Sequence, residues 1–259
     1  MAYYIYGTLY NNINRIKECL DSLKPLEPYK LFVVDNYSDD GSYEYLVKRA
    51  KLDTNIELHI TRKKCSRGKG KDIALKMLFS VNPKEDDLVF YIDFDVIYGK
   101  NFITYIKNYF KNHKDEVTTA FGIGIAQLNN FEWKDLNLAE DFERFARMKS
   151  LGIKIFYNPE MQYNNPNWFE NYKGGDESRY ANNIKYFIRA YKGWIDIERG
   201  IGFKNFKSFY ADAKTKSSIR KFFWLTAYII AKILGIYCYN KEVDNRKYIL
   251  GKYKYVHDD

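Results

Sequence analysis

Two acidic residues, Asp93 and Asp95, have the type and the spacing to hold a metal ion against a diphosphate. They stand two positions apart, directly after the apolar run 88–92. Carboxylates at the end of a strand can lie side by side above a sheet, where they would bind a hard cation such as Mg²⁺ or Mn²⁺. Such a cation would stabilise a diphosphate leaving group. The alternative is a solvated surface turn, in which two acidic residues are common.

A second acidic pair, Glu140 and Asp141, has the chemistry of a general base. A carboxylate in this pair could remove the proton from an attacking hydroxyl group. The neighbouring Arg144 could help to keep that carboxylate ionised. The alternative is structural, because acidic residues in the first turn of a helix also stabilise the helix dipole.

Two further motifs offer contacts to a nucleotide. Asp35 closes the apolar run 31–34, where its carboxylate could accept hydrogen bonds from a base or a ribose. The segment RGKGK (residues 67–71) places cations and glycines before a helix, which suits phosphates. It is not a Walker A loop, because Asp72 follows where Ser or Thr is needed. A capping or turn residue is the alternative for Asp35, and a plain basic turn is the alternative for RGKGK.

The elements that must position these residues alternate between strands and helices. Apolar runs predict strands over 2–6, 31–34, 56–60 and 88–92, and helical patterns predict helices over 14–23, 43–51 and 71–79. Asp and Ser residues before the second helix are suitable N-caps. This βαβαβαβ order predicts an α/β fold with a parallel sheet, whose strand ends carry the acidic and glycine-rich turns. Later in the chain we expect a helix over 102–110, a strand over 117–125, a helix beginning near Glu140, and a long loop or lid over 157–180.

Composition is that of a folded protein with a basic surface. The 259 residues are 46% hydrophobic and 29% charged, with a net charge of +9. A basic surface favours anionic partners such as nucleoside diphosphates, nucleic acid or an anionic membrane. The three cysteines, Cys19, Cys65 and Cys238, form no CxxC pair, and the three histidines are dispersed. We therefore expect reduced thiols and no zinc site.

The two ends of the chain bear on location. The opening residues MAYYIYGTLYNNI have no basic region of a secretory signal, so a cytoplasmic protein is expected. The stretch 222–238 is the most apolar of the chain, although Lys232 lies inside it. A buried helix, an in-plane membrane helix and a short membrane span all remain open for it. We divide the chain into a domain over 1–215 and a hydrophobic, basic helical segment over 216–259.

The order of these motifs resembles the family 2 glycosyltransferases, which are inverting enzymes of the GT-A fold. The resemblance runs from about Tyr3 to about Lys154. Four segments carry it: VVDNYSDDGS (33–42), RGKG (67–70) with Ala74, DFD (93–95) and ED (140–141). The chain departs from the family pattern at Tyr37, where glycine is frequent, and it has no QxxRW-like segment. The second departure argues against processive polymer synthesis.

The resemblance implies a role for each site residue. Asp35 and Arg67 would contact the nucleobase, in a pocket completed by residues around Thr8, Tyr10 and Asn11. Lys71 would belong to the same nucleotide site. Asp93 would lie near the ribose or the metal, Asp95 would bind the divalent cation, Mg²⁺ or Mn²⁺, and Asp141 would be the catalytic base with Glu140 as a second candidate.

The resemblance therefore predicts a non-processive, hexosyltransferase-like enzyme that uses a nucleoside-diphosphate sugar and an unidentified glycan or lipid-linked acceptor. It would be cytoplasmic or peripheral at the cytoplasmic face of a membrane. A nucleotidyltransferase that makes nucleotide sugars is one alternative, although the loop after the first strand lacks the usual GxGxR-type sequence. A basic nucleic-acid-binding protein is another, although no nucleic-acid-binding module is recognisable, and we expect no nucleic-acid partner.

Overall fold

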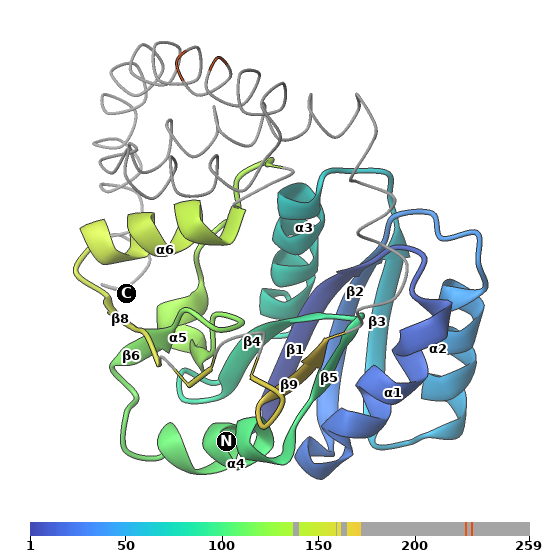
Figure 1. Cartoon of the computed structure of the whole chain (residues 1–259), viewed down its shortest axis with the longest axis horizontal. Helices are drawn as coiled ribbons and strands as arrows, with labels where there is room; N and C mark the ends of the chain where they lie inside the picture. The colour runs from blue at the N-terminus through green and yellow to red at the C-terminus, as the bar shows by residue number, and fades with distance from the viewer. Residues whose placement is uncertain (137–139, 159, 162–164, 172–225, 227–228, 230–259) are drawn as a thin grey trace.

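The apolar runs of the N-terminal third form a five-stranded sheet in the order β3-β2-β1-β4-β7 (Figure 1). The computed structural model describes residues 1–136, 140–158, 160, 161, 165–171, 226 and 229. All neighbours in the sheet are parallel except β4 and β7. The strands are β1 (Tyr3–Leu9), β2 (Tyr29–Asp35), β3 (Ile56–Arg62), β4 (Leu88–Asp93) and β7 (Gly124–Ile125).

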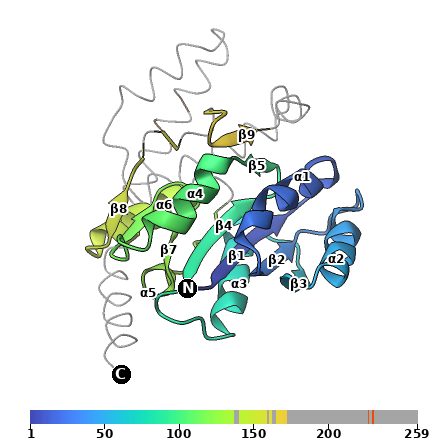
Figure 2. The same cartoon turned by 90° about the horizontal axis from the view of Figure 1, so that it is seen from below.

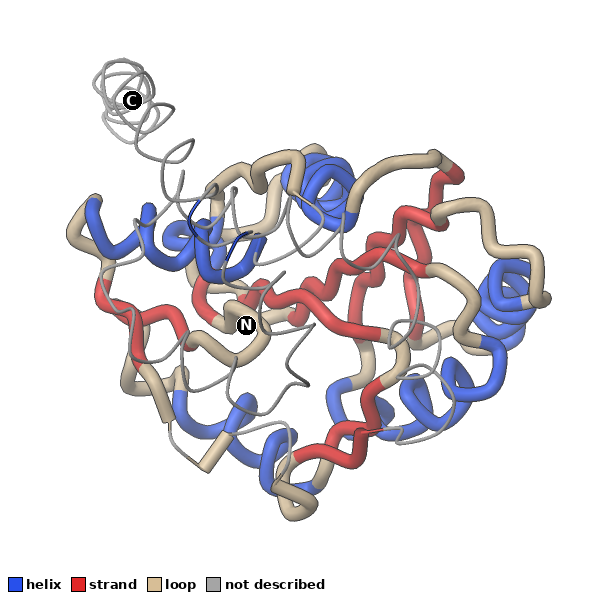
Figure 3. The backbone as a smooth tube through the Cα atoms, turned by 45° about the horizontal axis from the view of Figure 1, so that its top comes forward, coloured by secondary structure: helices blue, strands red, loops and turns tan. Residues whose placement is uncertain are grey.

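Helices cover both faces of this sheet. Figure 2 shows α3 on one face and α1 with α4 on the other, and the tube in Figure 3 shows the strands enclosed by helices. The helices are α1 (Ile13–Leu23), α2 (Ser42–Leu52), α3 (Arg67–Phe79), α4 (Lys100–Tyr109), α5 (Ala126–Asn129) and α6 (Glu140–Ser150), with a 3₁₀ turn over Lys24–Leu26. Because both faces are covered, β2 and β4 are almost continuously apolar and buried.

Two small sheets extend the domain beyond the central one. Strand β5 (Val96–Tyr98) follows β4 directly and pairs antiparallel with β9 (Phe169–Asn171). Strand β6 (Glu116–Thr118) pairs in parallel with β8 (Lys154–Phe156). Through these pairs the two strands that follow α6 are joined to the N-terminal half.

The predicted alternation of strands and helices is confirmed, with corrections at three places. The single strand expected over 117–125 is two strands, β6 and β7, because Phe121 and Gly122 adopt left-handed conformations with φ of 56° and 55° between them. The helix expected from residue 71 begins at Arg67. Helix α2 has Gly41 at its N-cap position, with no side-chain cap.

The predicted loop over 157–180 is only partly described. Its residues 169–171 form β9, because they complete the edge of β5, and so this part is not loop. Residues 172–180 lie outside the described residues, as do the segment 216–259 and the apolar stretch 222–238 apart from Thr226 and Ile229. These two residues are helical and exposed. Among the described residues, no helix combines the length and the apolar character that crossing a membrane requires.

Candidate active site

The predicted site residues converge at the carboxyl edge of the sheet. Strand β1 lies between β2 and β4, and the register places Asp35 beside Leu9 and Asp93 beside Thr8. Strand spacing then separates the ends of β2 and β4 by about 10 Å. The acidic ends of the two strands therefore lie at nearly the same height above the sheet.

Arg67 lies beside Glu140 and within the electrostatic influence of the other acidic residues. Its side chain is about half exposed, and its Nε lies 3.7 Å from Oε1 of Glu140. Burial on its own would lower the pKa of the guanidinium, but nearby carboxylates outweigh burial and raise that pKa above its usual value. Those carboxylates belong to Asp93, Glu140, Asp95 and Asp141. Side chains from α3, the end of β4 and the start of α6 thus share one electrostatic environment.

This arrangement corrects the expectation for Arg144. We predicted that it would keep Asp141 ionised, but its guanidinium is fully buried and points into the core. It donates hydrogen bonds to the carbonyl oxygens of Asn129 at 2.8 Å and Phe131 at 3.2 Å. Helical spacing explains the difference, because position 144 lies on the buried face of α6. Arg67, and not Arg144, is a cation whose charge interacts with that of Asp141.

Lys71 is also turned inward. Its Nζ donates to Oε1 of Glu140 at 3.1 Å, and both side chains are 3% exposed. The same ammonium lies 4.0 Å from the ring centroid of Tyr91 and 4.7 Å from that of Trp133. These surroundings satisfy the charge inside the protein by an ion pair and by aromatic faces. In this structure Lys71 therefore holds Glu140 at the start of α6.

The glycines of RGKG do not form the open turn that we expected. Gly68 and Gly70 lie in the first turn of α3, which Ser66 caps by accepting a hydrogen bond from the Lys69 N–H at 3.0 Å. A Cβ at Gly68 would collide with the Lys134 carbonyl oxygen, and one at Gly70 with a methyl group in β1. The glycines are thus required for close packing of protein segments, and the first N–H groups of α3 bond to Leu136 and Ser66.

Two loops at the same edge are joined into one wall by short hydrogen bonds. Asn11, in a left-handed conformation, exchanges hydrogen bonds with Asp39 at 2.8 and 3.1 Å, and its N–H donates to Ser38 Oγ at 3.1 Å. Thr8 is half-buried below this loop, and Tyr10 is exposed at its tip. We call the segments 10–12 and 35–42 the loop wall. It brings Tyr10, Asn11 and Asp35 of the predicted base pocket together, whereas Arg67, also predicted to contact the base, lies outside it beside Glu140.

Asp35 anchors the loop wall from below. Its carboxylate is fully buried, accepts from Ser38 Oγ at 2.6 Å, and accepts from Arg62 Nε at 2.8 Å. The Arg62 guanidinium lies 5.3 Å from the ring of Tyr37 and 4.5 Å from that of Tyr43. Tyr37, at the position where glycine is frequent, has φ of 57°. The turn therefore keeps the left-handed conformation that glycine would favour, but it adds an exposed aromatic ring.

Sequence reasoning missed several residues of this edge. Arg62 is the last residue of β3 and pairs in register with Asp35. In the sequence it is the first of three consecutive cations, RKK (62–64), and nothing distinguishes it from the other two. Trp133 packs on Lys71 and donates from Nε1 to the Tyr6 hydroxyl at 3.1 Å. The sequence around Trp133 has no helical or strand periodicity, so nothing in it indicated that Trp133 packs in the site.

The carboxylates at the end of β4 have the chemistry for a divalent cation. Asp93 is half-buried and Asp95 is exposed. Among the described residues, no three His, Cys, Asp or Glu side chains form a complete metal site. Two carboxylates nevertheless fit Mg²⁺ or Mn²⁺, because these ions commonly take one or two protein carboxylates and complete their shell with phosphate oxygens and water.

Comparisons with known proteins agree with this architecture. A family model described as Glycosyl transferase family 2 matches residues 7–166. The mannosyltransferase PcManGT from Pyrobaculum calidifontis, solved with GDP-Man and Mn²⁺, has a TM-score of 0.57 and 13% identity, covering 94% of this chain and 86% of that chain. S. aureus TarS has a TM-score of 0.54 and 17% identity over 95% of this chain, which spans 54% of that chain.

A shorter S. aureus TarS structure, residues 1–349 in complex with UDP, has a TM-score of 0.51 and 15% identity. It covers 99% of this chain and 92% of that chain. No curated protein matches the sequence. At these identities the solved structures establish the arrangement of the elements, and the family model covers the segments that carry all of the predicted site residues.

Proposed function

The chain belongs to glycosyltransferase family 2 and has the GT-A fold, and from this premise we propose that it transfers a sugar from a nucleoside-diphosphate sugar to an acceptor hydroxyl with inversion. One observation supports the proposal most: Arg67 lies 3.7 Å from Glu140 at the edge of the sheet where Asp93 ends β4, and the carboxylates of both segments raise the pKa of its guanidinium. A cationic group next to paired carboxylates can bind a diphosphate together with its cation. The UDP and the GDP-Man with Mn²⁺ in two structures of similar fold are donors and products of this type.

The diphosphate side of the reaction is assigned to the end of β4 and to α3. Asp93 and Asp95 would hold a divalent cation, which stabilises the diphosphate leaving group when bound. Arg67 is half exposed and adds a second positive charge beside this position. Its guanidinium would donate to phosphate oxygens, so that charge developing on the leaving group meets a preorganised cation.

Asp141 is assigned as the general base. It would take the proton of the acceptor hydroxyl while the hydroxyl oxygen bonds to the anomeric carbon and the nucleoside diphosphate departs from the opposite face. Glu140 fits this role less well, because it is 2% exposed and bound to Lys71. We therefore propose that Lys71 and Glu140 position the start of α6, and that Lys71 does not contact the nucleotide.

The nucleobase is assigned to the loop wall. Tyr10 and Tyr37 are 54% and 56% exposed, which leaves aromatic surface for a base to stack upon. Asn11 and Thr8 would line the same pocket. Asp35, whose carboxylate is already engaged by Ser38 and Arg62, would act by holding Arg62 in place.

Donor binding and turnover test these roles separately. A thermal-shift panel of UDP-, GDP- and dTDP-sugars, with and without Mn²⁺, should show selective stabilisation of the wild-type protein. Asp95→Asn should lose the part of this shift that depends on Mn²⁺. Asp141→Asn should keep the shift and lose about 10²- to 10⁴-fold in transfer rate. Asp86→Asn, at an exposed carboxylate outside the site, is the control. Full turnover by the Asp141 variant would reject the assignment of the base.

The two rival functions are less well supported. Family membership places the chain among enzymes that transfer sugars, whereas a nucleotidyltransferase would release pyrophosphate from a nucleoside triphosphate. A pyrophosphate assay separates the two reactions directly. Nucleic-acid binding would require a steep decrease of affinity with salt concentration in a filter-binding titration, and we expect none.

We also propose that the C-terminal segment meets a membrane surface near a lipid-linked acceptor. Support comes from the apolar stretch 222–238 with its flanking cations, and from Ile229, which is helical and 58% exposed. Flotation with anionic vesicles should recover the wild-type protein and less of an Ile229→Asp variant. Equal recovery of both proteins would contradict this placement, and the acceptor would then be sought among soluble glycans.

A further inference from the structure

The two acidic residues assigned to the divalent cation stand on a tight turn between β4 and β5. Strand β4 ends at Asp93 and β5 begins at Val96, so only two residues separate the strands. Burial alternates along this turn: Asp93 is half-buried, Phe94 is 1% exposed and Asp95 is exposed. The backbone therefore directs the two carboxylates to the accessible side and keeps the ring between them inside the protein.

The hydroxyl group of Tyr98, in β5, holds the backbone of this turn. The Asp93 N–H donates to the Tyr98 hydroxyl oxygen at 3.0 Å, and that hydroxyl donates to the Asp93 carbonyl oxygen at 3.3 Å. The same carbonyl oxygen accepts a longer hydrogen bond from the Cys19 thiol, at 3.8 Å. Both backbone groups of Asp93 are thus bonded to side chains.

The end of the sheet explains why a side chain takes this place. Alternate residues of a strand direct their N–H groups to the same edge, and Tyr91, two residues before Asp93, donates its N–H to the Phe121 carbonyl oxygen at 3.0 Å. In the described part of the chain, β4 has no strand partner on this edge beyond Val89. A backbone N–H inside a protein needs a partner. The Tyr98 hydroxyl supplies that partner where the sheet does not.

Tyr98 is itself fixed by its surroundings. Its N–H donates to Ser22 Oγ in α1 at 3.0 Å, and it pairs in register with Phe169 in β9. Its ring is in the core, at 4.9 Å from the ring of Phe102 and 5.1 Å from that of Phe121, and the residue is 3% exposed. The hydroxyl is therefore held in place by packed segments, whereas Asp95 in the turn is exposed.

We propose that Tyr98 is a positioning residue for the divalent cation, because its hydroxyl fixes the turn that carries Asp93 and Asp95. The proposal rests on the assignment of the cation to these two carboxylates in the proposed function. Mg²⁺ requires near-ideal octahedral geometry, so its affinity depends on how well the ligands are oriented. Groups that orient the ligands of a metal affect its affinity although they do not touch it.

A thermal-shift titration with Mn²⁺ or Mg²⁺ tests the proposal, at a fixed concentration of UDP, GDP or dTDP. It gives the metal concentration at half of the maximal shift. Tyr98→Phe keeps the ring in the core and removes only the hydroxyl. This variant should need about tenfold more metal than the wild type, and excess metal should restore the full shift. A purely structural role would lower the unfolding temperature of the free protein and leave this metal concentration unchanged.

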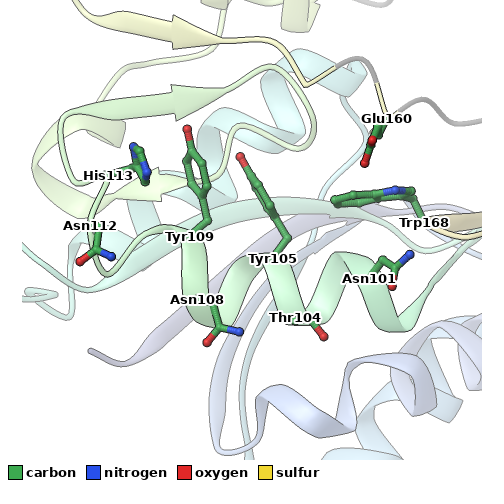
Figure 4. A pocket seen from close by; sticks show the side chains of 9 residues that line it. All are labelled: Asn101, Thr104, Tyr105, Asn108, Tyr109, Asn112, His113, Glu160 and Trp168. Carbon is green, nitrogen blue, oxygen red and sulfur yellow. The ribbon is translucent and has the colours of Figure 1, made fainter.

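Tyr109→Phe is the matched control. Tyr109 lies in the lining of a pocket on α4 that contains none of the residues 93–98 (Figure 4). Its hydroxyl donates to Glu116 at 2.6 Å, so this variant also loses a hydrogen bond of a tyrosine. It should need the same metal concentration as the wild type. Circular dichroism checks that both variants are folded.

The outcomes separate this proposal from the proposed function. If the wild type shows a metal-dependent shift and Tyr98→Phe needs no more metal than the wild type does, the role of Tyr98 is overturned and the assignment of the cation stands. If no nucleotide gives a metal-dependent shift in the wild type, the role of Tyr98 is overturned together with that assignment. Sugar transfer measured without added metal then decides whether the proposed reaction also fails.

Discussion

Two regions meet at the candidate site, and they are held in place in different ways. The loop wall has an exposed outer part over a buried base of Asp35, Ser38 and Ser42, and it is fastened by hydrogen bonds between residues at most about 30 positions apart, such as Asn11 with Asp39. The charged side chains between α3 and α6 are buried, and their ion pairs join segments that are distant in the sequence. Lys71 and Glu140, for example, are separated by 69 positions. We call Lys71, Glu140, Glu143, Arg144 and Arg147 the buried cluster.

The difference concerns how much each region tolerates change. A hydrogen bond in the exposed outer part of the loop wall, such as that between Asn11 and Asp39, competes with water, so its loss costs little. A charge in the buried cluster has no water to replace a lost partner, and removing one member leaves the other uncompensated. We infer that the loop wall can vary to suit a nucleobase, whereas the buried cluster must stay complete to fix the start of α6 and therefore Asp141.

The largest effect is expected for Lys71→Met. This change leaves the buried carboxylate of Glu140 without its closest cation, and the free energy of unfolding should fall by about 3 kcal/mol. Urea denaturation followed by circular dichroism measures it. Lys100→Met, on the exposed surface of α4, should change stability by less than about 0.5 kcal/mol. The double variant Lys71→Met/Glu140→Leu should recover most of the lost free energy of unfolding. If Lys71→Met alone is as stable as the wild type, the two regions do not differ in the way that we infer.

The next effect is expected for Gly68→Ala, which affects the contact between α3 and the segment 134–136. Because the new Cβ would collide with the Lys134 backbone, we expect a loss of about 2 kcal/mol together with weaker donor binding. Gly152→Ala is the matched control, since its surroundings are empty and only its φ of +88° is strained. That variant should lose about 1 kcal/mol and no donor affinity. Equal losses in both would show that packing at Gly68 is unimportant.

A smaller effect is expected for Ser38→Ala in the loop wall. The Ser38 hydroxyl donates to Asp35 and accepts from the Asn11 N–H, so its removal should cost about 1 kcal/mol. Thermal unfolding provides the measurement. Ser80→Ala removes an exposed hydroxyl that bonds only to a helical carbonyl and should cost less than about 0.5 kcal/mol. A loss as large as that of Lys71→Met would place the loop wall in the same class as the buried cluster.

The smallest effect is a pH dependence from Asp40. Burial alone would raise the pKa of this carboxyl, but hydrogen bonds from the Ser42 hydroxyl and from the Ile13 and Ser42 N–H groups outweigh it and lower the pKa below its usual 3.8. Because the folded-state pKa is below the unfolded one, the carboxylate stabilises the fold above pH 3.8. This stabilisation is lost as the pH falls through the folded-state pKa.

Comparison with Asp40→Asn isolates that contribution. The stability difference between wild type and variant should be constant near neutral pH and should shrink as the pH falls below about 3.8. Unfolding in urea at a series of pH values from neutral to acid measures it. A difference that stays constant down to the acid end would mean that Asp40 contributes through shape and not through its charge.

The part of the fold that follows from local pattern could be predicted. Apolar runs and helical periodicities identified β1 to β4 and α1 to α4, because strands such as β2 and β4 are apolar along most of their length and the helices bury one side. The prediction of one strand over 117–125 was wrong. The segment forms strands of two separate sheets, because Phe121 and Gly122 between them adopt left-handed conformations. A segment of mixed polar and apolar residues, such as 117–125, does not indicate by its local sequence which sheet it will join.

The sequence by itself determined which residue types stand near the ends of the strands: Asp35 at the end of β2, Asp93 and Asp95 at the end of β4, and Arg67 in the turn that leads into the next helix. Parallel connection then requires them to share one edge. The tertiary structure alone decided where the long side chains point. Lys71 turned inward to Glu140 and two aromatic rings, and Arg144 turned away from Asp141 into the core. The reason is that a long charged side chain takes the direction in which its charge is best compensated, and its partners here come from distant segments.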